Sequence, residues 1–147
     1  MKTTIFFDMD GTIANLYAVD NWLPKLRNED ASPYIEATPL INLALLARYI
    51  HKLQKIGYNV GIISWLSKKP SPAYDKAVTE AKMQWLQKHL PSVDFDEVHI
   101  IPYGIPKSLW ANSTNDILFD DEFNNRAEWC GNAYPETAIF EVIKELI

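Results

Sequence analysis

The segment TTIFFDMDGT (residues 3–12) decides the fold class of this chain. It begins with a short β-branched and aromatic run, residues 3–7, and then changes abruptly to the polar stretch Asp8-Met9-Asp10-Gly11-Thr12. A run of this kind predicts a buried strand, and the polar residues after it predict a tight turn. We therefore expect Asp8 and Asp10 to lie at the carboxyl end of a strand.

Further strands and helices are predicted to alternate along the rest of the chain. Apolar runs predict strands at residues 58–63, ending at Ser64, at 98–101, and at 116–119, ending in Asp120-Asp121. Helical spacing and capping residues predict helices at 38–57 with Thr38 as N-cap, after Ser71-Pro72, at 125–131 with an Asn125/Glu128 capping box, and at 139–147. This alternation predicts a single α/β domain over residues 1–147, a three-layer Rossmann-like, mostly parallel sheet with helices on both faces.

Composition narrows the classes of protein to which the chain can belong. Its 147 residues, 48% hydrophobic and 22% charged, fit one globular domain. A net charge of −5 disfavours nucleic-acid binding by a broad positive face. No apolar run approaches the ~20 residues that span a bilayer, which argues against a membrane protein. Because Cys130 is the single cysteine and two acids lie among the first ten residues, we expect a cytoplasmic protein without a disulfide or secretory leader.

Two pairs of acidic residues follow predicted strands, Asp8 with Asp10 and Asp120 with Asp121. The carboxyl ends of parallel strands meet at one edge of a sheet, so we expect these pairs to converge. Carboxylates gathered there would repel one another and raise one another's pKa unless a cation neutralised them. Oxygen ligands with positions left for water suit Mg²⁺. The sequence therefore predicts a Mg²⁺ site formed by Asp8, Asp10, Asp120 and Asp121.

These residues resemble the motifs of the haloacid dehalogenase (HAD) superfamily of phosphohydrolases. Residues 7–13 (FDMDGTI) resemble its DxDGT motif after an apolar strand, and residues 117–121 (ILFDD) resemble its acidic motif after the last core strand. Ser64 is similar to its Ser/Thr motif, and Lys107 to its lysine. The likeness implies a HAD-like topology for the predicted domain.

The inserted segment, at about residues 15–38, would be a minimal cap in such a fold. It is loosely patterned and predicts at most one short helix. Together with DMDGT and DDEFNN (residues 120–125), it looks most like the 5′(3′)-deoxyribonucleotidase branch of the superfamily. A short cap would leave the site open to larger phosphorylated partners, or would need a second subunit, as in a homodimer, to close it.

The resemblance implies a role for each acid. Asp8 would be the nucleophile that attacks phosphorus and forms an aspartyl-phosphate. Asp10 would protonate the leaving oxygen and then activate water, while its backbone carbonyl binds the metal. Asp120 would bind Mg²⁺ directly, and Asp121 would orient metal-bound water.

The remaining motif residues would hold the phosphate. Gly11 permits a tight turn that Thr12 helps to shape, and N–H groups after it can bind phosphate oxygens. Ser64 would donate a hydrogen bond and Lys107 a positive charge to the phosphoryl oxygens. Lys68 and Lys69 are alternatives to Lys107.

Aromatic residues near the expected site bear on the size of the substrate. Trp65 follows Ser64, where the family often has a small residue, so it makes one wall bulkier or stacks on a substrate ring. Tyr17, Trp22 and Tyr34 of the inserted segment could stack against a nucleobase. A nucleotide or another small phosphorylated metabolite is therefore the expected substrate of a Mg²⁺-dependent phosphate monoester hydrolase.

Two other functions remain open on the sequence alone. One is a phosphatase of nucleic-acid ends or of a phosphoprotein, served by an open site and a local basic strip of Lys68, Lys69 and Lys107. The other is a non-enzymatic switch that accepts a phosphoryl group, as signalling receivers do. The DxDGT pattern argues against the switch, because receivers place their acceptor after a middle strand and lack a general acid two residues beyond it.

Overall fold

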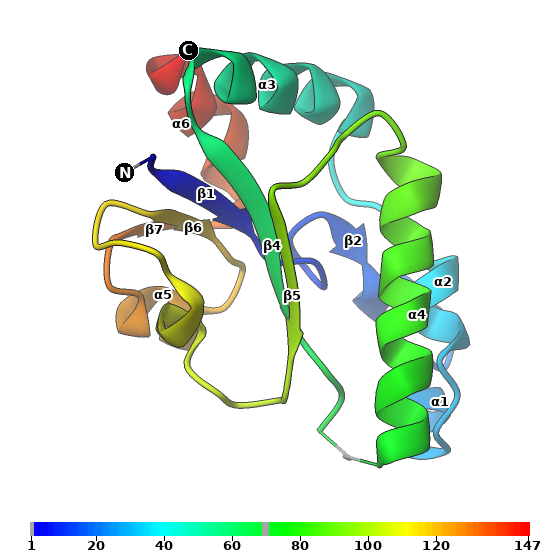
Figure 1. The fold of residues 1–147 in the computed structure, drawn as a ribbon. Coiled ribbons are helices and arrows are strands. Elements are labelled where there is room, and N and C mark those ends of the chain that lie inside the picture. Colours follow the sequence, from blue (N-terminus) through cyan, green and yellow to red (C-terminus); the bar gives the residue numbers. More distant parts are fainter. Residues whose placement is uncertain (1, 69–70) are drawn as a thin grey trace.

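A five-stranded parallel sheet runs through the centre of the computed structural model, which describes residues 2–68 and 71–147 (Figure 1). Its strands, in spatial order, are β5 (Glu97–Ile101), β4 (Asn59–Trp65), β1 (Thr4–Phe7), β6 (Ile117–Phe119) and β7 (Asn132–Tyr134). Every neighbouring pair is parallel. The predicted α/β class with a mostly parallel sheet is confirmed.

Helices cover both faces of this sheet. One face is covered by α3 (Leu43–Ile56), α4 (Pro72–His89) and α6 (Ile139–Leu146). The other is covered by the segment that holds the 3-10 helix η2 (Lys107–Trp110) and α5 (Phe123–Glu128). Side chains of β1 alternate between the two, since Ile5 and Phe7 join the larger core and Phe6 packs with Trp129. Among the described helices, none has the length and apolar character needed to cross a membrane.

The start of α3 corrects one expectation. Thr38 does not cap this helix, because residues Thr38–Pro39 form the short strand β3 and pair with β2 (Ala14–Asn15). The cap is Asn42, whose side chain accepts a hydrogen bond from the Leu45 N–H at 3.0 Å. The apolar residues of the helix have the predicted spacing, with Leu43, Leu46, Ile50 and Leu53 buried, but local sequence pattern does not contain the pairing of β3 with β2.

Some of the other predicted element boundaries are confirmed and others are wrong. Ser71 caps α4 as predicted, accepting from the Tyr74 N–H at 3.1 Å. The Asn125/Glu128 capping box is wrong, because Glu122 occupies the N-cap of α5 without a side-chain cap bond and Asn125 lies inside the helix. The strand predicted to end at Ser64 extends one residue further, because β4 ends at Trp65. Strand β7 was not predicted, since its three partly exposed residues show no apolar run.

Residues 15–38, from the end of β2 to the start of β3, are called here the cap segment. It forms the 3-10 helix η1 (Leu16–Ala18) and two short helices, α1 (Trp22–Arg27) and α2 (Ser32–Glu36), one more α-helix than expected. Figure 1 shows α1 and α2 beside α4. Two hydrogen bonds tie the segment to this helix: the Trp85 Nε1–H donates to the Ala37 carbonyl at 2.7 Å, and the Tyr74 hydroxyl donates to the Asp30 carbonyl at 3.1 Å. The cap segment is therefore held against α4.

The order of the strands reverses at β1, and this reversal marks a position at the carboxyl ends of the strands. The chain passes from β1 to β4 and β5 on one side, and then to β6 and β7 on the other. Phe7 is in register with both Ile62 and Phe119, so the residues that follow β1 emerge between the carboxyl ends of β4 and β6. In open α/β sheets, ligands bind in the crevice at such a reversal.

Candidate active site

The turn after β1 places the first two acids at this edge. The Met9 carbonyl accepts hydrogen bonds from the N–H groups of Thr12, Ile13 and Ala14 at 3.1, 3.0 and 2.9 Å, which folds the chain back on itself. Gly11 has a φ of 83°, and a Cβ there would collide with the Asp121 carboxylate. Glycine is thus required both by the backbone conformation and by the approach of an acidic side chain.

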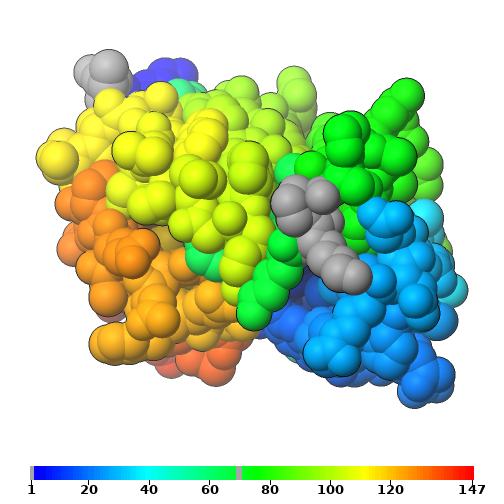
Figure 2. Space-filling model, turned by 90° about the horizontal axis from the view of Figure 1, so that it is seen from below, coloured from blue at the N-terminus to red at the C-terminus, as the bar shows by residue number. Residues whose placement is uncertain are grey.

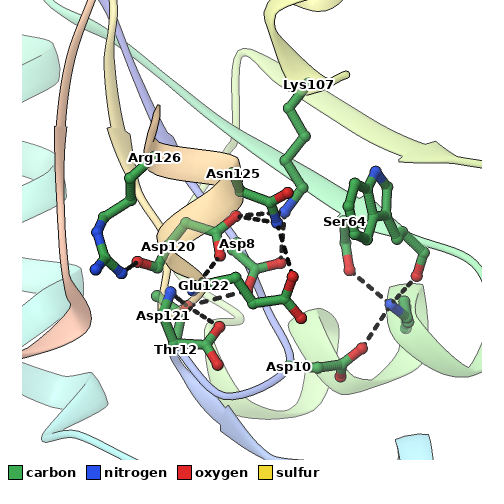
Figure 3. Close-up of polar contacts among 12 residues, drawn as sticks. Asp8, Asp10, Thr12, Ser64, Lys107, Asp120, Asp121, Glu122, Asn125 and Arg126 are labelled. Atoms are coloured by element: carbon green, nitrogen blue, oxygen red, sulfur yellow. Dashed lines mark hydrogen bonds and ion pairs between the residues drawn. The ribbon is translucent and has the colours of Figure 1, made fainter. Parts of the chain in front are cut away.

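Three carboxylates gather where the sequence predicts a metal site (Figure 3). Asp8, Asp120 and Asp121 each offer one oxygen, and these oxygens lie within 4.8 Å of one another. Thr12 joins two of these acids: its hydroxyl oxygen lies 3.0 Å from Asp8 Oδ2 and 3.2 Å from Asp121 Oδ1, and it accepts from the Asp121 N–H at 3.1 Å. The pairs that are far apart in sequence do converge. The carboxylate of Asp10 is not part of this cluster.

The electrostatics of the cluster favour a cation. Burial raises the pKa of Asp120 to about 6, and the nearby charge of Asp8 adds to this effect. Burial and Asp8 likewise raise the pKa of Asp121 to about 8. Both groups would therefore be ionised more easily beside a positive ion. A donor set made only of carboxylate oxygens fits a hard divalent cation such as Mg²⁺.

Lys107 reaches this cluster from η2. Its Nζ donates to Asp8 Oδ1 at 2.9 Å and to Asp120 Oδ2 at 2.7 Å. Burial alone would lower the pKa of Lys107, but the two carboxylates outweigh that effect and raise it, so the ammonium stays charged. Of the three lysines considered from the sequence, the exposed Lys68 lies instead over the Tyr103 ring, 5.3 Å from its centroid. Lys69 lies outside the described residues.

A second set of polar groups lies around Asp10 and Ser64, and it contains a residue that the sequence analysis missed. Lys82 of α4 donates to Asp10 Oδ2 at 2.8 Å and to Ser64 Oγ at 2.6 Å. Burial raises the pKa of Asp10, and the charge of Lys82 opposes that rise. The available signal was positional, because Lys82 shares the buried face of its helix with Val78 and Trp85, where a charged residue needs a partner.

Residues of α5 complete the surroundings of Asp120, and these were also missed. Asn125 donates to Asp120 Oδ2 at 3.1 Å, and the Glu122 N–H donates to Oδ1 at 2.9 Å. The Arg126 guanidinium donates to the Asp120 carbonyl at 2.9 Å. Asp120 is fully buried, and these bonds are what allow a carboxylate to remain there.

A cavity of about 540 Å³ opens beside these groups. Figure 2 shows this side of the molecule, with the blue cap segment facing the yellow and orange residues around η2 and α5 across a hollow. Its walls include two aromatic pairs, Tyr17 with Trp22 at 5.0 Å between ring centroids and Trp65 with Tyr103 at 4.8 Å. The residues lining it are Asp8, Asp10, Leu16, Tyr17, Trp22, Leu23, Leu26, Arg27, Tyr34, Trp65, Leu66, Ser67, Lys68, Tyr103, Lys107, Glu122 and Asn125.

Comparison with known proteins gives similarity in fold. No protein-family model and no curated protein sequence matches the chain. Among solved structures, a chain of the Pnkp1/Rnl/Hen1 complex matches with a TM-score of 0.60 and 14% identity over 92% of this chain, which spans 46% of that chain. The D,D-heptose 1,7-bisphosphate phosphatase from Burkholderia thailandensis matches with a TM-score of 0.53 and 15% identity over 86% of this chain and 70% of that one.

Proposed function

We propose that this chain is a HAD-type phosphatase that hydrolyses phosphate monoesters with Mg²⁺ through an aspartyl-phosphate. The observation that carries the proposal is the convergence of Asp8, Asp120 and Asp121 around one point, with Lys107 bonded to two of them. The arrangement supplies a nucleophile, a cation site and a fixed positive charge at the edge of the sheet where ligands bind. The match to a phosphatase structure supports the fold that this chemistry needs.

The proposed reaction begins at Asp8. One of its oxygens attacks phosphorus, the ester P–O bond breaks, and Asp10 gives its proton to the departing oxygen. Burial raises the pKa of Asp10, which favours the protonated form that this step needs. Asp10 then removes a proton from water, which attacks phosphorus and releases inorganic phosphate and free Asp8.

Other residues would stabilise charge in both steps. Lys107 and Ser64 would donate to the phosphoryl oxygens, on which negative charge is concentrated. The N–H groups that follow Gly11 do not serve in this way, contrary to the sequence-based expectation, because those of Thr12, Ile13 and Ala14 all donate to the Met9 carbonyl. Asp8, Asp120, Asp121 and the carbonyl of Asp10 would hold Mg²⁺. When bound, the ion neutralises charge on the phosphoryl group and on the carboxylates.

The cavity indicates a small phosphorylated substrate with a flat or apolar part. Its volume of about 540 Å³ lies in the range of ordinary ligand pockets. The aromatic pairs Tyr17–Trp22 and Trp65–Tyr103 offer surfaces on which a ring can pack. We propose a nucleotide as the first substrate class to examine and other small phosphorylated metabolites as the second.

A phosphate-release panel tests this function. Nucleotides, sugar phosphates, a 3′-phosphorylated oligonucleotide and a phosphopeptide are incubated with the wild type, with Mg²⁺ or with a chelator, and with Asp8→Asn. We expect Mg²⁺-dependent release from at least one small phosphate monoester, and at least a 10³-fold loss in Asp8→Asn at unchanged melting temperature. Release by Asp8→Asn at the wild-type rate would contradict the assignment of the nucleophile. Release from the macromolecular substrates alone would replace the proposed substrate class.

A further inference from the structure

Lys82 lies on the buried face of α4, where an apolar residue is usual. It is 1% exposed, on the face of α4 that packs against the sheet and the cap segment. Its Nζ donates to Asp10 Oδ2 at 2.8 Å, to Ser64 Oγ at 2.6 Å and to the Trp65 carbonyl at 2.6 Å. A lysine ammonium has three N–H donors and no acceptor, so these three bonds use all of its capacity.

Because all three N–H groups of Lys82 are used, its possible roles in the site are limited. With no N–H left over, it cannot also bind a phosphoryl oxygen, which separates its role from that of Lys107. The ring of Tyr34, from the cap segment, lies 5.0 Å from Nζ and covers the ammonium on another side. Lys82 is thus enclosed by β4, by the turn after β1 and by the cap segment.

The bond to Ser64 has a consequence for the direction of that hydroxyl. Because Lys82 can only donate, Ser64 Oγ must accept from it. The hydroxyl hydrogen of Ser64 is then free to be donated to a different acceptor. In the proposed function that acceptor is a phosphoryl oxygen.

The bond to Asp10 fixes a carboxylate in the same way. Lys82 holds Oδ2, which leaves Oδ1 as the oxygen that can face the departing group of a substrate. An acid must lie within hydrogen-bond reach of the oxygen it protonates, and small misplacements are costly. One ammonium therefore sets the geometry of Asp10 and Ser64 together.

We propose that Lys82 is a positioning residue that holds the general acid Asp10 and the phosphate-binding Ser64 in their working orientations. This inference rests on the proposed function for its chemistry. It assigns to α4 a role in the reaction besides its role in the core.

The test compares two leaving groups. A p-nitrophenolate ion departs without being protonated, whereas the alkoxide of a nucleoside 5′-monophosphate needs the proton of Asp10. In Lys82→Met we expect kcat for the nucleotide to fall about 10²-fold, within the range of general acid catalysis, and kcat for p-nitrophenyl phosphate to fall at least tenfold less. In Lys82→Arg, which keeps the charge, we expect smaller losses with the same preference. An unchanged ratio between the two substrates in both variants would overturn the inference.

Lys76→Met is the matched control, because Lys76 lies on the exposed face of the same helix. We expect it to keep both activities and their ratio. Crystal structures of the wild type and Lys82→Met provide a readout that does not need activity: the Asp10 carboxylate and Ser64 Oγ should change position in the variant. If both stay in place, Lys82 does not position them, whatever the kinetics show. If the wild type hydrolyses neither substrate, the nucleotide is ruled out as the substrate class, and the structures still decide the positioning role.

Discussion

The Asp120 carboxylate depends on its neighbours, because its hydrogen bonds are what allow it to lie buried in the site. It is fully buried, yet Oδ1 accepts from the Glu122 N–H and Oδ2 accepts from Lys107 and Asn125. A charge in such a position is tolerated only when it is paired and hydrogen-bonded. The sequence pointed to Asp120 through its place after an apolar run. It did not predict the hydrogen bond from Asn125 to Asp120, because that bond depends on how α5 turns back over the end of the strand.

Gly11→Ala tests the close approach of the turn to Asp121. The substitution imposes a positive φ on alanine, at a cost of about 1–3 kcal/mol, and drives a methyl group into the Asp121 carboxylate. We expect Mg²⁺ affinity, measured by calorimetry, to fall at least tenfold.

Gly57→Ala is the control for Gly11→Ala. Gly57 also has a positive φ, 113°, but a Cβ there meets nothing within 4 Å. It should lose only the stability that the strained φ costs, less than Gly11→Ala loses, and keep the wild-type affinity for Mg²⁺. Equal affinities in the two variants would contradict the role given to Gly11.

At the scale of elements, Asp116 connects the starts of two neighbouring strands. Its carboxylate accepts from the Thr4 N–H of β1 at 2.9 Å, and from the N–H groups of Asn112 and Ser113 before β6 at 2.7 and 3.1 Å. It lies at the opposite end of these strands from the carboxylates of Asp8, Asp120 and Asp121. The sequence places Asp116 at the start of a predicted strand, apart from the acids that follow strands. It does not predict the bond to the Thr4 N–H, because that contact depends on the pairing of β1 with β6.

Asp116→Ala leaves the buried N–H of Thr4, and the more accessible N–H groups of Asn112 and Ser113, without their acceptor. Since a buried N–H without an acceptor costs about 1–3 kcal/mol and the other two can turn to water, we expect the free energy of unfolding to drop by about 2 kcal/mol in urea titrations. The exposed Asp94 provides the comparison, and Asp94→Ala should change stability by no more than about 0.5 kcal/mol. A similar small effect in Asp116→Ala would show that the carboxylate does not hold the strands together.

The elements that were predicted and those that were missed differ in a physical way. Strands β1 and β4 and helix α4 carry their own signals, because each buries a continuous run or a stripe of apolar residues. Strands β3 and β7 form through pairing with partners elsewhere in the chain, and their own residues are half-exposed or exposed. Such pairing is a tertiary effect, and local sequence pattern does not contain it.

At the scale of the whole molecule, folding gathers negative charge around one point. Asp120 and Asp121 have a usual pKa of 3.8, and in the folded chain these values rise to about 6 and about 8. Between about pH 4 and pH 8, these two groups therefore bind more protons in the folded, metal-free protein than in the unfolded chain. Their contribution to the free energy of unfolding falls as the pH rises through this range.

Thermal unfolding with and without Mg²⁺ measures this linkage. With a chelator, the melting temperature should decline between pH 5.5 and pH 8.5, because the raised pKa values favour the folded state only at low pH. Mg²⁺ binds the ionised carboxylates, so the increase in melting temperature that it gives should be larger at pH 8.5. Asp121→Asn should reduce the decline. An increase from Mg²⁺ that is equal at both pH values would argue against a site made of these acids.

The sequence predicts the α/β arrangement of the whole molecule and the end of the sheet at which the site lies. Alternating elements place Asp8 and Asp120 at the same ends of parallel strands, and the two residues converge because β1 and β6 are neighbours in the sheet. The position of Lys82 could not be predicted in that way, because its contacts require α4, β4 and the cap segment to pack together.

In the proposed function, Asp8 forms a covalent bond to phosphorus during each turnover. To detect this bond, the protein is mixed with Mg²⁺ and a nucleoside monophosphate that it hydrolyses, the reaction is stopped with acid after short times, and phosphorylated peptides are located by mass spectrometry. We expect a phosphoryl group on Asp8 that forms and decays at least as fast as phosphate is released. Phosphate release without modification of Asp8, or a phosphoryl group that stays on Asp8 without further turnover, would contradict it.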